Sequence, residues 1–373
     1  MPFSNIKSLF SEQLPVSNLQ NYWELSDKSN QASLETVKPL ATSTLGNGSV
    51  NPLLVNLGNI APTIKLTPFE DNSGAKNLKA DSLVSPVFAG LAARFPGRSK
   101  DLFTSTGVTG NASLDYNVTI QFKGSLWASN PTLRLAFENA ANLVSQIITD
   151  DLGHDSTIPF FPGIGLNTQV DDIYLTAELT DIDGEGGILG QAGPQLISGT
   201  TQLTLVGLME FDVADGANFD AQGLFDDIVF HEMLHTLGFG TLWDYGDRDL
   251  VNNNLFNGSN AVDAYNLTYA TTAAYDPLTA ITVEDDGGPG TAGGHWEEGP
   301  INAQPEPRVS FDNEIMTGFI NNSNYLSTMT IASLQDLGYE TVWSEIYADY
   351  VNNGTDVPLV YQNSLLTGSP DFV

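Results

Sequence analysis

Hydrophobic residues in the middle of the chain recur at helical spacing in three segments. Apolar positions three to four residues apart predict helices over 130–152, 220–238 and 327–339. Gly238 ends the second segment, where a glycine can adopt the left-handed conformation that terminates a helix. Ser327 is suited to cap the third helix.

Alternating hydrophobic and polar residues predict strands over 115–126, 170–184 and 200–212. After these regular elements come a long segment rich in Asn, Gly and Asp (243–294) and a turn that contains a methionine (313–318). The pattern predicts a regular upper part built from strands and helices, followed by an irregular lower part.

The charge of the chain changes near residue 100. The 373 residues hold 13 Lys and Arg against 45 Asp and Glu, a net charge of −32. Residues 1–100 nevertheless contain nine basic and seven acidic residues, so nearly all of the negative charge lies beyond them. We therefore expect a separate, partly disordered N-terminal extension over 1–104 and a second unit over 105–373.

Composition also narrows the partners and the compartment. The acidic chain lacks the basic patch that nucleic-acid binding requires, and no run of about 18 apolar residues could span a membrane. The absence of cysteine excludes disulfides and cysteine metal sites. Residues 1–30 lack signal-peptide features, and the ending Asp-Phe-Val is similar to the end of an uncleaved export signal. We expect secretion by a signal-peptide-independent route, or otherwise a cytoplasmic location.

The second predicted helix carries the motif H-E-x-x-H at His231, Glu232 and His235. Residues four apart on a helix lie about 40° apart around its axis, so the two imidazoles can point at one ion. Glu232 is rotated away from them and could act as a general base on water beside that ion. The chain holds four histidines in all, so chance rarely produces this spacing. Two core histidines on a buried helix are the alternative.

A catalytic zinc ion needs three protein ligands and one open position, so the motif requires a third ligand. Thr241 stands where the compact H-E-x-x-H-x-x-G-x-x-H pattern has its third histidine. His154 lies in a polar turn, whereas His295 follows flexible glycines that could carry it to the ion. A carboxylate, as in thermolysin-like peptidases, is the other possibility. The downstream candidates are Glu297, Glu298 and Glu314.

Three ordered segments resemble the leishmanolysin family of metzincin-type zinc endopeptidases. They are HEMLHTLGFG (231–240), GGHWEE (293–298) and DNEIMTGF (312–319), with 59 residues between His235 and His295. Further segments over roughly 115–342 are similar to the cysteine-free bacterial branch of that family. The best-known members are disulfide-rich and kept inactive by a cysteine, and neither feature can occur in this chain.

The resemblance implies roles for particular residues. The ligands of one catalytic zinc ion would be His231, His235 and His295. Glu232 would be the general base, Met316 would lie beneath the metal in a Met-turn, and Gly238 would turn the chain sharply after the helix. An extended substrate would pair with an edge strand around Gly207, Leu208 and Met209.

The implied fold is α+β and metzincin-like, with a twisted mixed sheet and an active-site helix in an upper part to about residue 240. A lower part with the Met-turn would span 241–345, and a C-terminal tail would cover 346–373. Residues 1–104 would be either a removable propeptide or a permanent extension. The implied function is zinc-dependent hydrolysis of peptide bonds in proteins. The alternative is a zinc-stabilised binding or surface protein without turnover.

A second kind of metal site is weaker in the sequence. Asp181, Asp183 and Glu185 could bind Ca²⁺, but the segment fits the helix–loop–helix calcium consensus at its first positions only. A plain acidic turn is the alternative. The sequence gives no indication of the oligomeric state.

Overall fold

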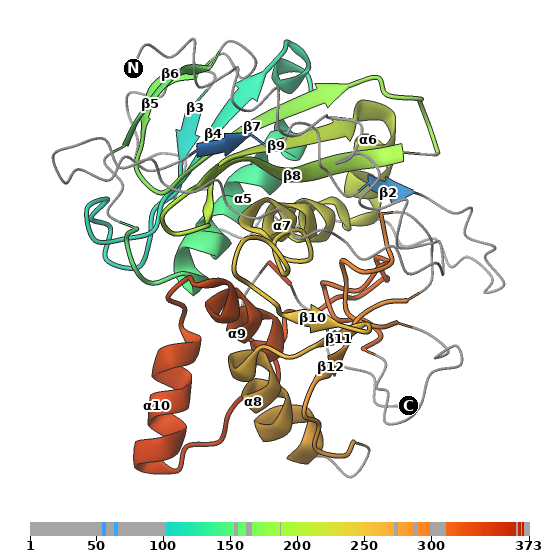
Figure 1. The fold of residues 1–373 in the computed structure, drawn as a ribbon. Helices are drawn as coiled ribbons and strands as arrows, with labels where there is room; N and C mark the ends of the chain where they lie inside the picture. The colour runs from blue at the N-terminus through green and yellow to red at the C-terminus, as the bar shows by residue number, and fades with distance from the viewer. Residues whose placement is uncertain are drawn as a thin grey trace, which may run out of the picture.

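The computed structural model describes residues 54–56, 63–65, 102–152, 156–161, 166–186, 188–271, 275–285, 290–298, 311–362, 365–366 and 368. These residues form an upper part, in which a large sheet lies over two helices, and a lower part of shorter helices and strands (Figure 1). The predicted α+β class with a mixed sheet is confirmed.

The upper part is built on a seven-stranded sheet with the order β1-β8-β9-β7-β4-β3, in which β2 also pairs with β8. The three strands β4, β7 and β9 run parallel, whereas β3 is antiparallel to β4 and β8 is antiparallel to β9. The bounds are β1 (Leu54–Asn56), β2 (Thr63–Lys65), β3 (Leu102–Thr104), β4 (Val118–Lys123), β7 (Ile173–Thr180), β8 (Ile188–Ser198) and β9 (Thr204–Asp212).

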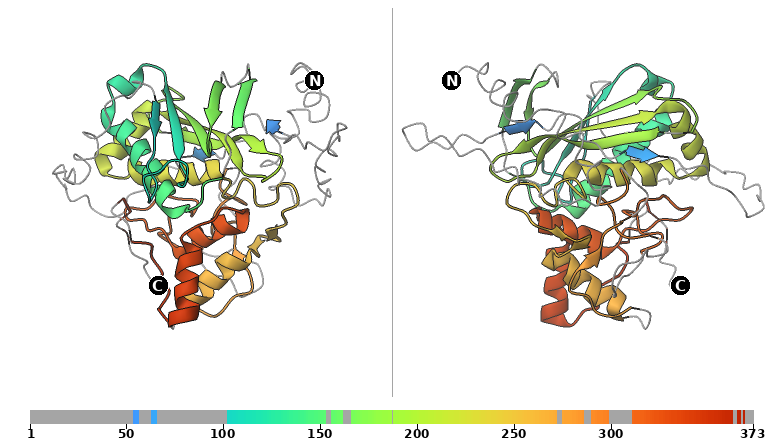
Figure 2. Two further views of the ribbon diagram at one scale, coloured as in Figure 1. Left: turned by 90° about the vertical axis from the view of Figure 1, so that its left-hand side faces the viewer. Right: turned by 45° about the vertical axis from the view of Figure 1, so that its right-hand side comes forward.

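Two long helices lie side by side beneath this sheet, α5 (Pro131–Ile147) and α7 (Phe225–Leu237) (Figures 1 and 2). Buried aromatic rings join them to it. The ring of Phe137 in α5 lies 5.4 Å from that of Phe211 in β9 and 6.3 Å from that of Phe225 in α7. Edge-to-face aromatic pairs stabilise a core beyond the area that they bury. This cluster therefore fixes α7 against the sheet.

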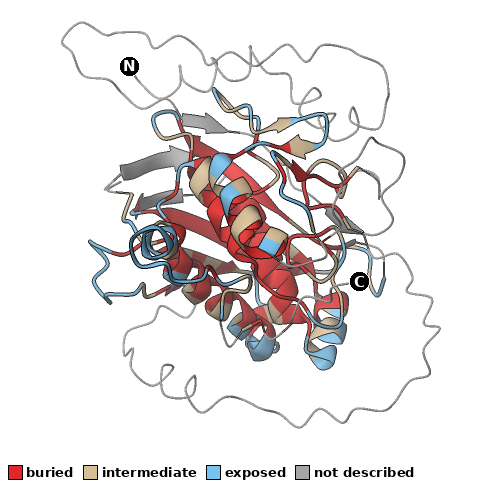
Figure 3. Cartoon of the chain, turned by 90° about the horizontal axis from the view of Figure 1, so that it is seen from below, coloured by how far each residue is buried: buried red, intermediate tan, exposed pale blue. Residues whose placement is uncertain are grey.

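The lower part contains α8 (Ser259–Thr268), α9 (Thr328–Leu337) and α10 (Trp343–Asn353) beside a small sheet of β10 (Val251–Asn252), β11 (Leu255–Phe256) and β12 (Ile281–Thr282). The Asp336 carboxylate in α9 accepts hydrogen bonds from the backbone N–H groups of Asn260 and Ala261 at the start of α8. Seen from below, most of the described helices and strands are coloured as buried, and exposed residues lie mainly on loops and on outward faces of helices (Figure 3).

The remaining described elements are short or peripheral. They are η1 (Leu126–Ala128), β5 (Ser156–Phe161), β6 (Leu166–Val170), α6 (Val213–Gln222) and η2 (Tyr269–Thr271). None of the helices in the described part of the chain has the length and apolar character needed to cross a membrane.

The predicted helices and strands are present with shorter bounds, and one prediction joined two helices. The segment 220–238 contains the end of α6 and all of α7, which are separated at Gly223. Gly223 has φ +76°, in the left-handed region that ends a helix. Strand β8 was not predicted, because its glycines and Pro194 are typical of turns. Such residues are tolerated near a sheet edge, and the pairing of β8 with β9 shifts register after Pro194.

The prediction that Gly207, Leu208 and Met209 lie in an edge strand is wrong. They belong to β9, which pairs with β8 on one side and with β7 on the other, so its backbone groups are already used. Gly207 also lies against α7, where an added Cβ would come within 3.0 Å of the Thr236 side chain. The long strand nearest this edge is β8, and the short strands β1 and β2 pair along it.

One expected boundary falls within a described element, and another directly follows one. Strand β3 lies upstream of residue 105 and belongs to the main sheet, and α10 continues across residue 346. Most of the segment 1–104 lies outside the described residues.

Candidate metal centre

Helix α7 places His231, Glu232 and His235 inside the molecule. Apart from Asp226, the residues of α7 are buried, and each of these three side chains is at most 1% exposed. The helix ends at Gly238, whose φ of +113° turns the chain back so that the Phe239 carbonyl meets the last turn. The predicted turn at Gly238 is therefore present.

His295 reaches the same point from the lower part. The backbone N–H of its neighbour Trp296 donates to the Met316 carbonyl at 2.9 Å. The Trp296 indole is fully buried against the rings of Phe239 and Trp243, with centroid distances of 5.1 and 5.4 Å. These contacts fix the chain at residue 296 and so position His295 in front of α7.

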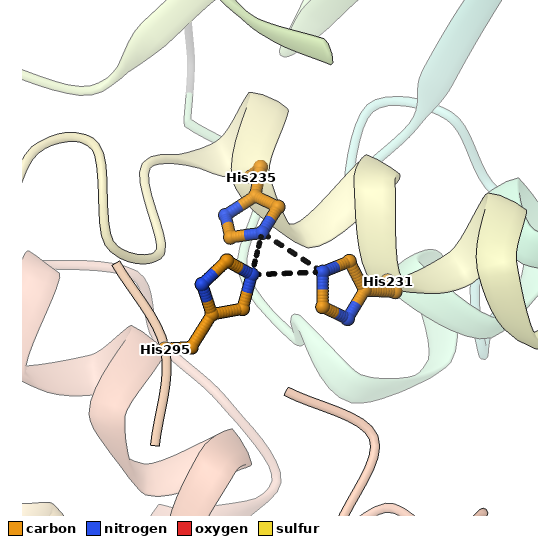
Figure 4. Close-up of side chains that lie close together, drawn as sticks. All are labelled: His231, His235 and His295. Atoms are coloured by element: carbon orange, nitrogen blue, oxygen red, sulfur yellow. Dashed lines mark hydrogen bonds between the residues drawn. The ribbon is translucent and has the colours of Figure 1, made fainter. Parts of the chain in front are cut away.

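The Nε2 atoms of the three histidines face one another (Figure 4). They lie 3.0 Å apart for His231–His235 and His235–His295, and 3.1 Å apart for His231–His295. The structure thus brings together the three predicted ligands, two from one helix and one from 60 residues further along the chain.

Each imidazole uses its other nitrogen to contact a backbone carbonyl. The Nδ1 atom lies 2.6 Å from the Ile315 oxygen in His231, 2.9 Å from the Phe239 oxygen in His235 and 2.8 Å from the Thr291 oxygen in His295. A carbonyl accepts, so each Nδ1 carries the proton and each Nε2 presents a lone pair. The dashed Nε2 contacts in Figure 4 therefore bring three lone pairs together, which is unfavourable unless a cation lies among them.

Burial keeps these histidines neutral. It lowers the pKa of His231 to about 3 and that of His295 to about 4, and it lowers the pKa of His235 well below its ordinary value. Neutral imidazole is the form that ligates metals.

The donor set fits a zinc ion. Zinc bound to nitrogen at about 2.1 Å with tetrahedral geometry separates its ligand atoms by about 3.4 Å, close to the observed spacing. Three histidines leave the fourth position open, as catalytic zinc sites require. The Nδ1–carbonyl contacts are the outer-shell hydrogen bonds that fix the tautomer and orientation of zinc-binding histidines.

Glu232 is a buried carboxylate next to His231. It is fully buried, and neither of its oxygens has a hydrogen-bond partner among the described residues. Burial raises its pKa well above the ordinary value. A buried carboxylate without partners costs free energy. A cation beside it would favour its ionised form.

None of the described alternative ligands joins the three histidines. Glu314 accepts four hydrogen bonds elsewhere, and Glu298 accepts from the Phe319 backbone and the Asn321 amide. Glu297 belongs to a different group, with Glu284 and Asp285. His154 lies outside the described residues.

Met316 is fully buried, as a residue beneath the metal would be, and its carbonyl receives the Trp296 N–H. Its role in a Met-turn stays a prediction. The carbonyls that orient the histidines were not foreseen, because a backbone group has no signature in the sequence. The identity of the third ligand did have one, in the segment GGHWEE.

The predicted calcium site is not among the groups of described residues that could hold a metal ion. The loop there is organised by Asp212, whose Oδ2 accepts from the backbone N–H groups of Ile182, Asp183 and Gly184. These bonds lower the pKa of Asp212 although burial opposes them. The loop is therefore held by a carboxylate that binds its N–H groups, and calcium stays a prediction.

Comparison with known proteins agrees with this geometry. No curated protein matches the chain. A family model described as leishmanolysin matches residues 184–349, a range that includes His231, Glu232, His235 and His295. This similarity covers less than half of the chain and supports a leishmanolysin-like metallopeptidase family.

Proposed function

We propose that the protein is a zinc-dependent endopeptidase with a metzincin-type active site. The observation that carries this proposal is the convergence of three neutral imidazole nitrogens beside a buried carboxylate without partners. His231, His235 and His295 would hold the ion. When bound, zinc would polarise the scissile carbonyl and make a water molecule more acidic.

Glu232 performs the proton transfers in this proposal. Its carboxylate takes a proton from the attacking water and then gives it to the amine that leaves. Burial raises the pKa of Glu232, and this suits the first step, because a stronger base takes a proton from water more readily.

The test compares wild-type protein with Glu232→Gln in casein cleavage and zinc content. We expect the variant to retain zinc and to lose cleavage by roughly 10²–10⁴-fold, the usual contribution of general acid–base catalysis. Glu345→Gln, which changes an exposed carboxylate on α10, is the matched control and should cleave like wild type. A wild-type protein that binds zinc and cleaves nothing would favour the binding-protein alternative.

We also propose that an extended substrate pairs with β8, in place of the interior strand β9. The support is the order of the sheet, in which β8 follows β9 toward the edge. The N-terminal strands pair antiparallel with the same strand: Leu54 lies opposite Ser198, and Thr63 lies opposite Gln191. An extended peptide can add to a sheet through its backbone in this manner.

In this proposal the N-terminal segment is a removable propeptide that occupies the substrate edge. Because β3 belongs to the main sheet, the removed segment would have to end before Leu102. Mass spectrometry of the active species tests the idea, and we expect a new N-terminus between residues 66 and 101. Full activity from a chain with its original N-terminus would rule out the propeptide.

A further inference from the structure

We propose that Glu314 is a positioning residue for the metal centre, acting on His231 through one peptide group and on the neighbour of His295 through Thr330. The inference rests on the proposed zinc site. Glu314 itself is not a ligand, and its carboxylate is fully buried.

The link to His231 passes through the peptide group between Ile315 and Met316. The Met316 N–H donates to Oε2 of Glu314 at 2.6 Å, and the Ile315 carbonyl accepts from Nδ1 of His231 at 2.6 Å. The two bonds use opposite ends of the same planar group. A rotation of this group would break both bonds together, so the carboxylate fixes the direction of the carbonyl that orients the imidazole.

The carboxylate also polarises this peptide group. A negative charge at the N–H end strengthens the carbonyl as an acceptor, because hydrogen bonds in a chain reinforce one another in a low-dielectric interior. The His231 contact is the shortest of the three histidine–carbonyl contacts, which measure 2.6, 2.9 and 2.8 Å. Zinc-binding histidines often donate directly to a carboxylate. Here one peptide group stands between the two.

The second oxygen of Glu314 connects to the residue beside His295. Oε1 accepts from the Thr330 hydroxyl at 2.6 Å, and that hydroxyl accepts from Nε1 of Trp296 at 2.8 Å. The Trp296 backbone donates to the Met316 carbonyl as well. Glu314 is thus tied to both sides of the metal centre, toward His231 by one oxygen and toward His295 by the other.

The donors around Glu314 require that both of its carboxylate oxygens act as acceptors. Ser327 adds its backbone N–H at 3.0 Å and its hydroxyl at 2.8 Å to Oε1. A buried carboxylate is expensive unless such donors satisfy it. An amide of the same shape could accept at one oxygen position only, so Glu314→Gln must leave a backbone N–H facing an NH₂ group.

The experiment measures zinc affinity by competition with a chromophoric chelator and the visible spectrum of the cobalt-substituted protein, for wild type and Glu314→Gln. Loss of an outer-shell partner typically weakens zinc binding about 10–100-fold, and we expect a loss in this range with a changed cobalt spectrum. Asp336→Asn is the matched control. This substitution also replaces a carboxylate that accepts backbone N–H groups, but those groups lie at the start of α8. Its zinc affinity and cobalt spectrum should stay as in wild type.

Zinc affinity within threefold of wild type and an unchanged cobalt spectrum in Glu314→Gln would overturn the proposal, as would an equal loss in Asp336→Asn. If Glu314→Gln does not fold, the imidazole protons of the wild-type zinc protein serve instead. We expect the His231 Nδ1 proton to resonate furthest downfield of the three Nδ1 protons. A different order would overturn the proposal that Glu314 acts on His231 through the peptide group. Zinc binding without proteolysis would refute the proposed function and leave this inference supported by its own readouts. A wild-type chain that binds no zinc would end both.

Discussion

Nδ1 of His231 lies 2.6 Å from the carbonyl oxygen of Ile315, a residue 84 positions further along the chain. This contact joins α7 of the upper part to the segment that precedes α9 in the lower part. The candidate metal centre therefore spans the two parts, and contacts that hold one part against the other also hold the three histidines in place.

His295→Ala should abolish tight zinc binding. It removes one of three ligands, so the loss should exceed the roughly 10–100-fold that an outer-shell change costs. Thr241→Ala is the informative control, because residue 241 is where the compact motif would place its third ligand. Equilibrium dialysis should show one zinc per chain for Thr241→Ala. Tight binding of one zinc by His295→Ala would show that another group supplies the third ligand.

Asp227→Asn should become more stable relative to wild type as the pH rises from 5 to 8. Burial raises the pKa of Asp227 to about 7 from an ordinary 3.8, with Asn324 donating to its Oδ2 at 2.7 Å. The folded state holds this proton between about pH 4 and 7, where the unfolded state has released it, so the wild type loses stability as the pH rises through this range. The variant has no such loss. We expect it to gain on the order of 2 kcal/mol on wild type between pH 5 and 8.

Urea unfolding of the metal-free proteins at the two pH values provides the measurement. Asp263→Asn, at an exposed position of α8, is the control and should follow wild type at both. A stability difference between Asp227→Asn and wild type that does not change with pH would show that the buried carboxyl does not titrate in this range.

Gly238→Ala should destabilise the fold more than Gly223→Ala. Both glycines have positive φ, +113° and +76°, and both end helices. An added Cβ at residue 238 would lie 2.7 Å from Cδ1 of Leu242, whereas at residue 223 it would meet nothing within 4 Å. We expect a loss of about 1 kcal/mol at 223 from backbone strain and about 2–4 kcal/mol at 238 from strain plus overpacking.

The two glycine variants also differ in their position relative to zinc. The Phe239 carbonyl, directly after Gly238, accepts from Nδ1 of His235. Gly238→Ala should therefore weaken zinc binding, and Gly223→Ala should not. Thermal unfolding and zinc competition give both quantities, and equal effects of the two changes would contradict the steric argument.

Local patterns in the sequence predicted the long central elements of the upper part and one helix of the lower part. Helical spacing indicated α5, α7 and α9, and alternation indicated β4, β7 and β9, because these elements are amphipathic or bounded by turn residues. The alternation of residues along one strand does not predict which strands lie beside it in the sheet. For this reason β9 was wrongly predicted to be an edge strand. The strand that lies beyond it, β8, has two glycines and Pro194 in its interior and so lacks a strand signal.

The sequence predicted some residues of the candidate site and their roles more fully than others. Helix geometry alone predicts that His231 and His235 can bind one ion. The residues between 235 and 295 do not predict where the chain returns to this helix, so the assignment of His295 depended on the family resemblance. Glu314 was considered as a ligand, but in the structure its carboxylate oxygens accept hydrogen bonds from Met316, Ser327 and Thr330. Which donors surround a buried carboxylate is a tertiary property that no local pattern encodes.

A zinc titration of the metal-free protein, followed by peptide cleavage, tests the central claim most directly. We predict no cleavage without metal and a rise that ends at one equivalent of zinc per chain, because three histidines form one site. Cleavage by the metal-free protein, or no cleavage at any zinc concentration once residues before 102 have been removed, would contradict the assignment of this chain as a zinc endopeptidase.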